Sequence, residues 1–124
     1  MALEGLIFDE GSALNNKLLE LSMENQRVIA NNLANADTPG YVRFKLDYQK
    51  KLASALESGD NKSIGDVKGK LVKDESGNMK LDGNNITVAT EMTEMMQNSV
   101  LYSLLARSFT TRINILKSAI TGTR

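Results

Sequence analysis

The sequence of 124 residues contains no cysteine and no histidine. Without cysteine there is no disulfide framework, no thiolate metal site and no cysteine nucleophile. Without histidine the commonest general base and the commonest metal ligand are missing as well. One proline and nine glycines favour long regular elements over a turn-rich sheet. We therefore expect no catalytic, metal or cofactor site, and a mainly α-helical chain.

Neither positive nor negative charge dominates, because fifteen Lys and Arg balance fifteen Asp and Glu. A nucleic-acid-binding protein usually carries a basic excess, so no nucleic-acid partner is expected. The charge is unevenly placed: residues 1–40 carry six acidic and two basic side chains, and residues 87–124 carry two acidic and four basic ones. The two ends of the chain can therefore attract each other, within a subunit or between neighbours.

Long hydrophobic runs are also missing. No apolar stretch approaches the roughly 18 residues that a membrane span requires. Residues 1–10 contain acidic side chains and lack the basic n-region of a secretory signal. We expect no membrane span and no cleaved signal peptide, while an export route without a cleaved signal stays open.

The first region, residues 1–41, is expected to hold a helix from about Ser12 to Ala36. Ser12 can act as the N-cap, because its hydroxyl can accept a free backbone N–H of the first turn. Apolar residues follow the helical period, and the same spacing then continues through asparagines. The apolar positions, which predict a packing seam, are Leu14, Leu18, Leu21 and Val28, and the asparagines are Asn25, Asn32 and Asn35.

A turn is predicted directly after this helix. Pro39 pushes Thr38 out of the α region. Pro39 and Gly40 suit the two central positions of a type II turn, where the second position needs a positive φ. We expect this turn to redirect the chain and to place the middle region outside the helical layers.

The middle region, residues 42–86, is polar, lysine-rich and irregular. Phe44, Leu46 and Tyr48 alternate with polar residues and suit a short extended piece, whereas residues 48–56 suit a short helix. Residues 71–72 and 79–81 flank a turn-like segment at 74–77, which predicts a small β-hairpin. The acidic residues show no catalytic pattern and are interpreted as solvating charges; they are Asp47, Asp60, Asp66 and Asp74.

The third region, residues 87–124, shows the clearest periodicity. Thr87 is a candidate N-cap, and Gly122 lies where a C-terminal stop is expected. Between them, alternating steps of four and three residues mark ten positions, of which nine are apolar: Val88, Met92, Met95, Ser99, Tyr102, Ala106, Phe109, Ile113, Leu116 and Ile120. This spacing predicts a long helix with a coiled-coil-type packing seam.

The predicted length of this helix indicates an elongated molecule. A helix over residues 88–120 would be about 50 Å long, whereas a compact globule of this chain length would be roughly 35 Å across. The first and last helices can pair without enclosing each other. The last helix also carries a second apolar set, which needs another neighbour: Val100, Leu101, Leu104, Leu105 and Ile115. Either other subunits cover this set, or the middle region of the same chain does.

Residues 30–41, ANNLANADTPGY, resemble the N-terminal signature of the flagellar rod, hook and hook-associated proteins. That signature is similar to A-N-N-[IL]-A-N-x-x-T-P-G-[YF], and every fixed position is matched. The short chain, together with residues 82–85, 91–92 and 112–120, resembles the proximal rod members of the family. The motif residues predicted to act in assembly are Asn31, Asn32, Asn35, Asp37, Thr38, Pro39, Gly40 and Tyr41.

The resemblance implies a structural subunit of the basal-body rod, a drive shaft in the periplasm, and not an enzyme. In such proteins the terminal helices pack together as the inner layers of a tube. The implied partners are further copies of the chain, a FlgC-type rod protein and the basal adaptor FliE. The implied export route is the flagellar type III apparatus, which needs no cleaved signal.

Individual residues of the sequence also allow simpler structural interpretations. Asn31, Asn32 and Asn35 can be solvated or capping residues, or buried amides that fix the register of packed helices. Buried amides must find partners, in the turn or in a neighbouring subunit, because a stranded one costs about 1–3 kcal/mol. Met92, Met95 and Met96 are interpreted as packing residues that adapt to irregular contacts.

The sequence is also compatible with a second class of function. The chain could be a soluble helical adaptor or secretion chaperone that binds one partner through its C-terminal helix. A rod subunit should form tubes with its partners, whereas an adaptor should saturate at a fixed stoichiometry.

Overall fold

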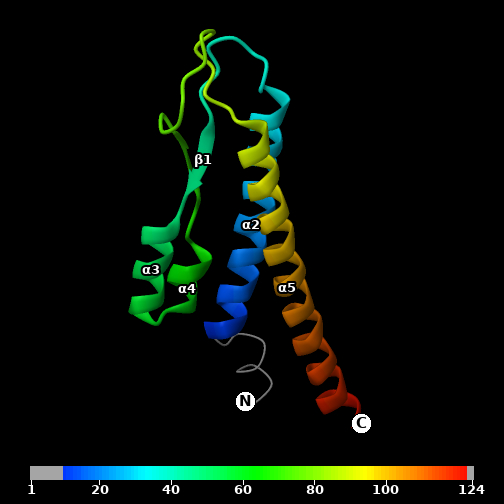
Figure 1. Ribbon diagram of the computed structural model, residues 1–124. Coiled ribbons are helices and arrows are strands. Elements are labelled where there is room, and N and C mark those ends of the chain that lie inside the picture. Colours follow the sequence, from blue (N-terminus) through cyan, green and yellow to red (C-terminus); the bar gives the residue numbers. More distant parts are fainter. Residues whose placement is uncertain (1–9, 123–124) are drawn as a thin grey trace.

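The computed structural model describes residues 10–122 of the chain. Two long helices lie side by side along the length of the molecule, and a smaller layer packs on the side of the first helix that faces away from the second (Figure 1). The predicted fold class, a mainly α chain with an elongated pair of terminal helices and a small β element, is confirmed. In order, the elements are α2 (Glu10–Ala34), β1 (Phe44–Asp47), α3 (Gln49–Ser58), α4 (Asn61–Gly65), β2 (Lys70–Lys73) and α5 (Val88–Thr121).

Helix α2 ends near the expected place, and the predicted turn follows it. The Tyr41 N–H donates to the Thr38 carbonyl at 3.2 Å, and Gly40 has a φ of 73°. Both are features of the predicted type II turn. The start of the helix differs, because Ser12 lies inside α2 and is not its N-cap. The expectation about a signal peptide concerns residues that lie almost entirely outside the described range.

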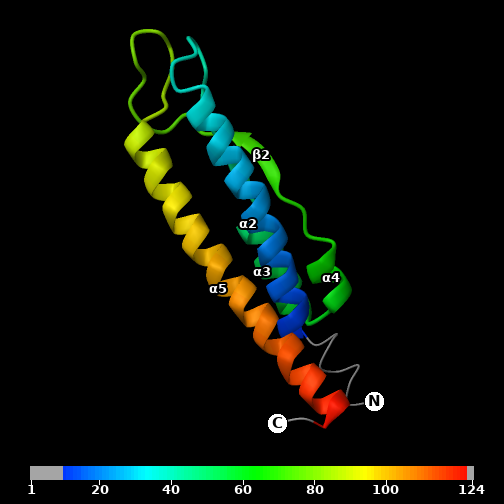
Figure 2. The same ribbon diagram turned by 90° about the vertical axis from the view of Figure 1, so that its right-hand side faces the viewer.

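Helix α5 has 34 residues, so it is about 51 Å long. It runs antiparallel to α2, and the two helices stay close along most of their length (Figure 2). Thr87 occupies the N-cap position, but its side chain makes no capping hydrogen bond. Gly122 ends the helix in a left-handed conformation, and its N–H donates to the Ser118 carbonyl at 2.9 Å. The predicted stop at Gly122 is therefore confirmed.

The two strands form an antiparallel pair in which Phe44 lies opposite Lys73 and Asp47 opposite Lys70. The hairpin predicted between residues 71–72 and 79–81 was wrong in its second strand. Strand β1 has a buried side chain, Leu46, that anchors it on α2, whereas residues 79–81 are exposed and form no strand. The pairing therefore joins β2 to the earlier segment, and α3 and α4 fill the connection.

The hydrophobic core lies between α2 and the middle region. Leu21 and Val28 of α2 pack with Leu46 of β1 in one cluster. Leu14 and Leu18 pack against a second cluster, formed by the α3 and α4 segment: Leu52, Ala55, Ile64 and Val67. The apolar seam of α2 is therefore covered by the middle region of its own chain.

Helix α5 contributes almost nothing to this core. Two of its side chains are buried, Glu91 and Asn98, and both are polar. The middle region packs on α2 and leaves the second apolar set of α5 exposed, apart from the half-buried Leu105. Within residues 10–122, no helix is both long enough and apolar enough to cross a membrane.

Candidate functional site

Arg43 joins three segments that are distant in sequence. Its guanidinium Nε lies 2.7 Å from Glu91 Oε1, its Nη1 2.7 Å from Asp74 Oδ2 and its Nη2 2.9 Å from Glu94 Oε2. Glu91 and Glu94 lie at the start of α5, Asp74 directly follows β2, and Arg43 directly precedes β1. We call these four residues the Arg43 cluster. It fixes the start of α5 to both strands of the middle region.

The Arg43 cluster is largely withdrawn from water. The side chain of Glu91 is 1% exposed and that of Arg43 is 14% exposed. Burial lowers the pKa of Arg43, but the hydrogen bond and charge of Glu91, followed by the charges of Glu94 and Asp74, raise that pKa overall. The guanidinium therefore stays charged and compensates the buried carboxylate of Glu91.

The carboxylates of the Arg43 cluster do not form a metal site. Within the described part of the chain, no group of three or more acidic side chains is arranged to hold a metal ion. All three carboxylates are instead bound to the guanidinium of Arg43. The arrangement fixes the start of α5 to the two strands.

Asn32 forms a second polar junction beside the Arg43 cluster. It is 0% exposed, and its amide nitrogen donates to the Phe44 carbonyl at 2.8 Å and to Glu91 Oε2 at 3.2 Å. Its oxygen accepts from the Phe44 N–H at 3.0 Å and from the Tyr41 hydroxyl at 3.3 Å. This amide thus ties α2 to β1 and to α5, with its donors and its acceptor all engaged.

Asn84 and Asn85 close the same region from the segment before α5. Asn84 Nδ2 donates to the carbonyls of Asn35 and Thr38, each at 2.9 Å, which satisfies backbone groups at the end of α2 and in the turn. Asn85 Oδ1 accepts from the Arg43 N–H at 2.8 Å. The turn, β1 and the start of α5 are therefore held by one connected set of buried amides.

The contact between α2 and α5 is also mainly polar. Asn98 Nδ2 donates to the Ser22 carbonyl at 2.8 Å and to Gln26 Oε1 at 2.7 Å. Nearer the far end, Arg112 Nη1 donates to Ser12 Oγ at 2.6 Å. Four α5 residues that bond to α2 recur every seven positions and form what we call the inner line: Glu91, Asn98, Leu105 and Arg112.

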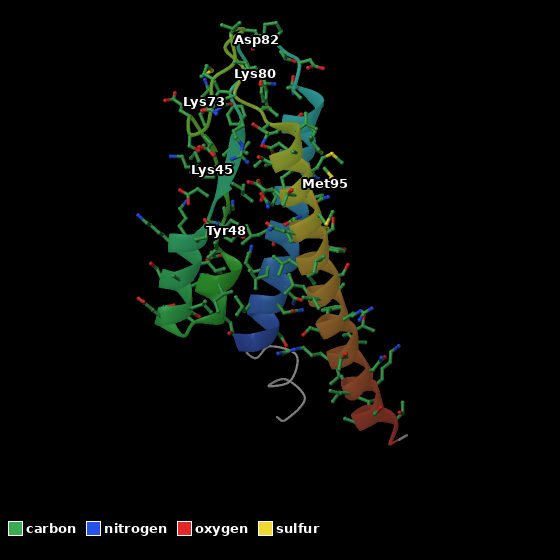
Figure 3. The ribbon with its side chains drawn as sticks, in the orientation of Figure 1. Lys45, Tyr48, Lys73, Lys80, Asp82 and Met95 are labelled. Atoms are coloured by element: carbon green, nitrogen blue, oxygen red, sulfur yellow. The ribbon has the colours of Figure 1, made fainter. Side chains whose placement is uncertain are left out.

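Large apolar side chains lie exposed on both sides of the inner line. Figure 3 shows the side chains of α5, among them Met95, extending from the helix, while Lys45 and Lys73 mark the strands on the opposite side of α2. Of the predicted seam residues of α5, Met95, Ala106 and Leu116 are half-buried. The other predicted seam residues of α5 are exposed: Val88, Met92, Ser99, Tyr102, Phe109, Ile113 and Ile120. An exposed apolar strip of this length is typical of a protein–protein contact surface.

Residues 11–41, which form α2 and its turn, match the family model of the flagella basal body rod protein. The chain is similar to the flagellar basal body rod protein FlgB of Bacillus subtilis, with 35% identity over 78% of this chain and 82% of the relative. It is 31% identical to FlgB of Borrelia hermsii over 79% of this chain and 86% of the relative. The chain belongs to the FlgB family of flagellar basal body rod proteins. It therefore has a structural role in the flagellar rod, and these relatives are named as rod proteins and not as enzymes.

The motif of this FlgB-family chain lies where α2 meets the middle region. Asn32 is buried, whereas Asn31, Asp37, Thr38 and Pro39 are exposed. Asn35 Nδ2 donates to the Asn31 carbonyl at 2.8 Å and its oxygen accepts from the Thr38 hydroxyl at 3.1 Å. The ring of Tyr41 meets the ring of Phe44 edge-on at 6.0 Å. Within one subunit, the motif therefore orders the turn and its junction with β1.

Several residues of the site carried no local signal in the sequence. The interpretation of Asp74 as a solvating charge was wrong, because it is 7% exposed and bound to Arg43. Asp60 is also more than a solvating charge, since its side chain accepts from the Lys62 N–H and caps α4. Arg43 itself was not singled out, because its partners lie 31 to 51 positions away in the sequence.

We expect Gly40→Val to destabilise the FlgB-family fold by about 2 kcal/mol. The φ of 73° at Gly40 lies in the left-handed region, which is costly for a residue with a Cβ and especially for a branched one. Urea unfolding measures the loss. Gly65→Val, at a helical glycine with open space around it, is the control and should lose less. Equal losses in the two variants would contradict the role given to the turn.

Low pH should destabilise the Arg43 cluster, because it protonates the carboxylate of Asp74. The Ser76 hydroxyl, with help from the Ser76 N–H and the charge of Arg43, holds the pKa of Asp74 below its ordinary value despite burial. A lowered folded-state pKa adds stability above the unfolded-state pKa of about 3.9, and this stability is lost as the pH falls through the folded-state value.

The stability gap between the wild type and Asp74→Asn should therefore be widest above about pH 4 and should narrow at lower pH. Urea unfolding over a pH series measures this gap. Glu75→Gln, at the exposed neighbouring position, is the control and should stay within about 0.5 kcal/mol of the wild type at neutral pH. A gap that is constant down to pH 2 would contradict the prediction.

Proposed function

We propose that this protein self-assembles and co-assembles through its terminal helices into the wall of a tubular drive shaft, the proximal part of the flagellar rod. One observation carries the proposal: α5 turns Glu91, Asn98 and Arg112 toward α2 and leaves large apolar residues exposed on both sides. In a protein that works as a monomer, the apolar stripe of a surface helix would face the core. Membership of the rod-protein family supports this reading.

The exposed strip of α5 contains large apolar side chains along its length. Met96 is 70% exposed, Leu104 is 60% exposed and Ile120 is 65% exposed. Burying apolar surface stabilises a contact by roughly 25 cal/mol per Å². Because the strip extends along most of a helix about 51 Å long, it suits several neighbours packed along a common direction. The proposed assembly role of the exposed seam residues of α5, such as Val88, Phe109 and Ile120, rests on the same exposure.

The buried amides supply what an apolar strip lacks, which is a defined register. An apolar surface tolerates sliding, whereas a polar group at a packed helix position aligns its partners. Within the subunit, Asn32 and Asn98 fix α2 against α5, and the Arg43 cluster fixes α5 to the middle region. A rod that transmits torque requires subunits that do not slip, and these contacts provide that rigidity.

The proposed partners are further copies of this chain, a FlgC-type rod protein and the basal adaptor FliE. The proposed location is the part of the basal body that crosses the periplasm, reached through the flagellar type III export apparatus without a cleaved signal. The opposite charges of residues 1–40 and 87–124 support contacts between the terminal segments of neighbouring subunits.

Electron micrographs of basal bodies from cells that lack this protein test the proposal. We expect basal bodies without a complete rod, loss of motility, and recovery of both when the protein is supplied. As the control, Glu57→Gln, an exposed change on α3, should restore motility fully. A complete rod in cells that lack the protein would overturn the proposal.

A further inference from the structure

A groove runs between α2 and α5 on one side of the inner line. It contains a hollow of about 480 Å³ beside Met23, Ala30 and Tyr102. A second hollow of about 300 Å³ lies beside Asn16, Phe109 and Ile113. Asn16, Met23 and Ala30 are spaced seven residues apart, so the two hollows lie along the same side of α2. We call this surface the α2–α5 groove.

The α2–α5 groove contains an unsatisfied polar atom as well as apolar walls. Ser22 lines the larger hollow and is 3% exposed, and its hydroxyl has no hydrogen-bond partner in the described residues. This oxygen is closed to solvent, so it lies beneath the surface that an occupant would contact. The groove therefore offers mainly apolar contact to an occupant.

The same chain carries a surface that suits this groove. On the other side of the inner line, α5 presents an exposed face with a single charged residue, Arg107, which we call the outer flank: Gln97, Val100, Leu101, Leu104, Arg107, Thr111 and Ile115. From Val100 to Ile115 the outer flank is about 23 Å long. The α5 wall of the groove, from Ser99 to Leu116, is about 26 Å long. The two surfaces match in length and in apolar character, and they point away from each other within one molecule.

We infer that the outer flank of one copy docks in the α2–α5 groove of the next copy. This inference rests on the proposed function and adds the two faces that meet. Because the flank and the groove are different surfaces, the contact is heterologous and leaves a free groove and a free flank at the ends of every pair. Such contacts generate rings or open helical arrays and do not stop at a dimer. A flank-to-flank contact would be isologous and would end growth at two copies.

Cysteine cross-linking can test this contact cleanly, because the chain contains no cysteine of its own. Single cysteines replace Asn16, Met23 or Ala30 in the groove, and Gln97, Leu104 or Thr111 on the flank. Each set is spaced by seven residues, or about 10.5 Å, so any axial register brings a groove position within about 5 Å of a flank position along the axis. Pairs of differently tagged full-length variants, one from each set, are expressed together in cells that lack the protein, and the motile cells are then oxidised.

At least one groove–flank pair is expected to form a disulfide between copies, and pairs from within one set should form far less. Glu57→Cys on α3 is the control, and it should link to neither set. Motile cells that show only flank–flank or groove–groove links, or no link at all, would overturn the inference while the proposed function stands. Cells that need no copy of the protein for motility would overturn the proposed function itself. If a flank variant abolishes motility, Gln97→Cys and Thr111→Cys, at polar exposed positions, keep the test open.

Discussion

Replacing Arg43 with methionine is expected to lower the free energy of unfolding by about 3 kcal/mol. The substitution removes the cation that compensates Glu91, whose side chain is 1% exposed. A buried carboxylate without its partner costs several kcal/mol, while Glu94 is 40% exposed and adds little. Methionine keeps most of the length of the side chain, so the loss reports mainly the missing charge.

Urea unfolding, followed by circular dichroism, measures this effect in the full-length chain. Arg107→Met, the same substitution at an exposed position of α5, is the matched control and should change stability by less than about 0.5 kcal/mol. Adding Glu91→Gln to Arg43→Met should recover part of the loss, because the buried charge then disappears. A loss in Arg43→Met no larger than that in Arg107→Met would show that the cluster does not stabilise the fold.

Replacing Asn32 with leucine is expected to lower the free energy of unfolding by about 2–3 kcal/mol. Leucine is similar in size but can satisfy neither the N–H nor the carbonyl of Phe44, and both bond to Asn32 in the native protein. The Tyr41 hydroxyl also loses its acceptor. Because α2, β1 and α5 meet at this amide, we also expect the substitution to impair rod assembly.

The unfolding free energy and the motility of complemented cells check this prediction together. Asn31→Leu is the matched control, since Asn31 is the preceding residue of the same motif and is exposed. It should leave stability nearly unchanged. Normal stability and motility in the Asn32→Leu variant would refute the idea that this amide fixes the junction.

The features that the sequence predicted well are the local ones. Pro39 and Gly40 define their turn through their own backbone preferences, and Gly122 ends α5 for the same reason. The length of α5 follows from an uninterrupted period over its 34 residues. Each of these features depends on residues within a few positions of one another, so no knowledge of the fold was needed.

Contacts between distant segments were harder to predict. A period shows that one face of α2 is buried, but it does not say what covers it, and Leu21 and Val28 prove to meet Leu46 of β1. The partner of β2 was misplaced for the same reason. Arg43 and Glu91 lie 48 positions apart, and a single charged residue in a lysine-rich segment gives no sign of burial. Their pairing becomes visible when the strands bring them together.

The strand layer touches both long helices by different means, and this has a mechanical consequence. Leu46 contacts α2 through apolar packing. Arg43, three residues earlier in the same segment, binds α5 through ion pairs. A twisting force applied to one helix is thus transmitted to the other through β1 as well as directly. Sliding of one helix along the other would therefore strain both the packing of Leu46 on α2 and the ion pairs between Arg43 and α5.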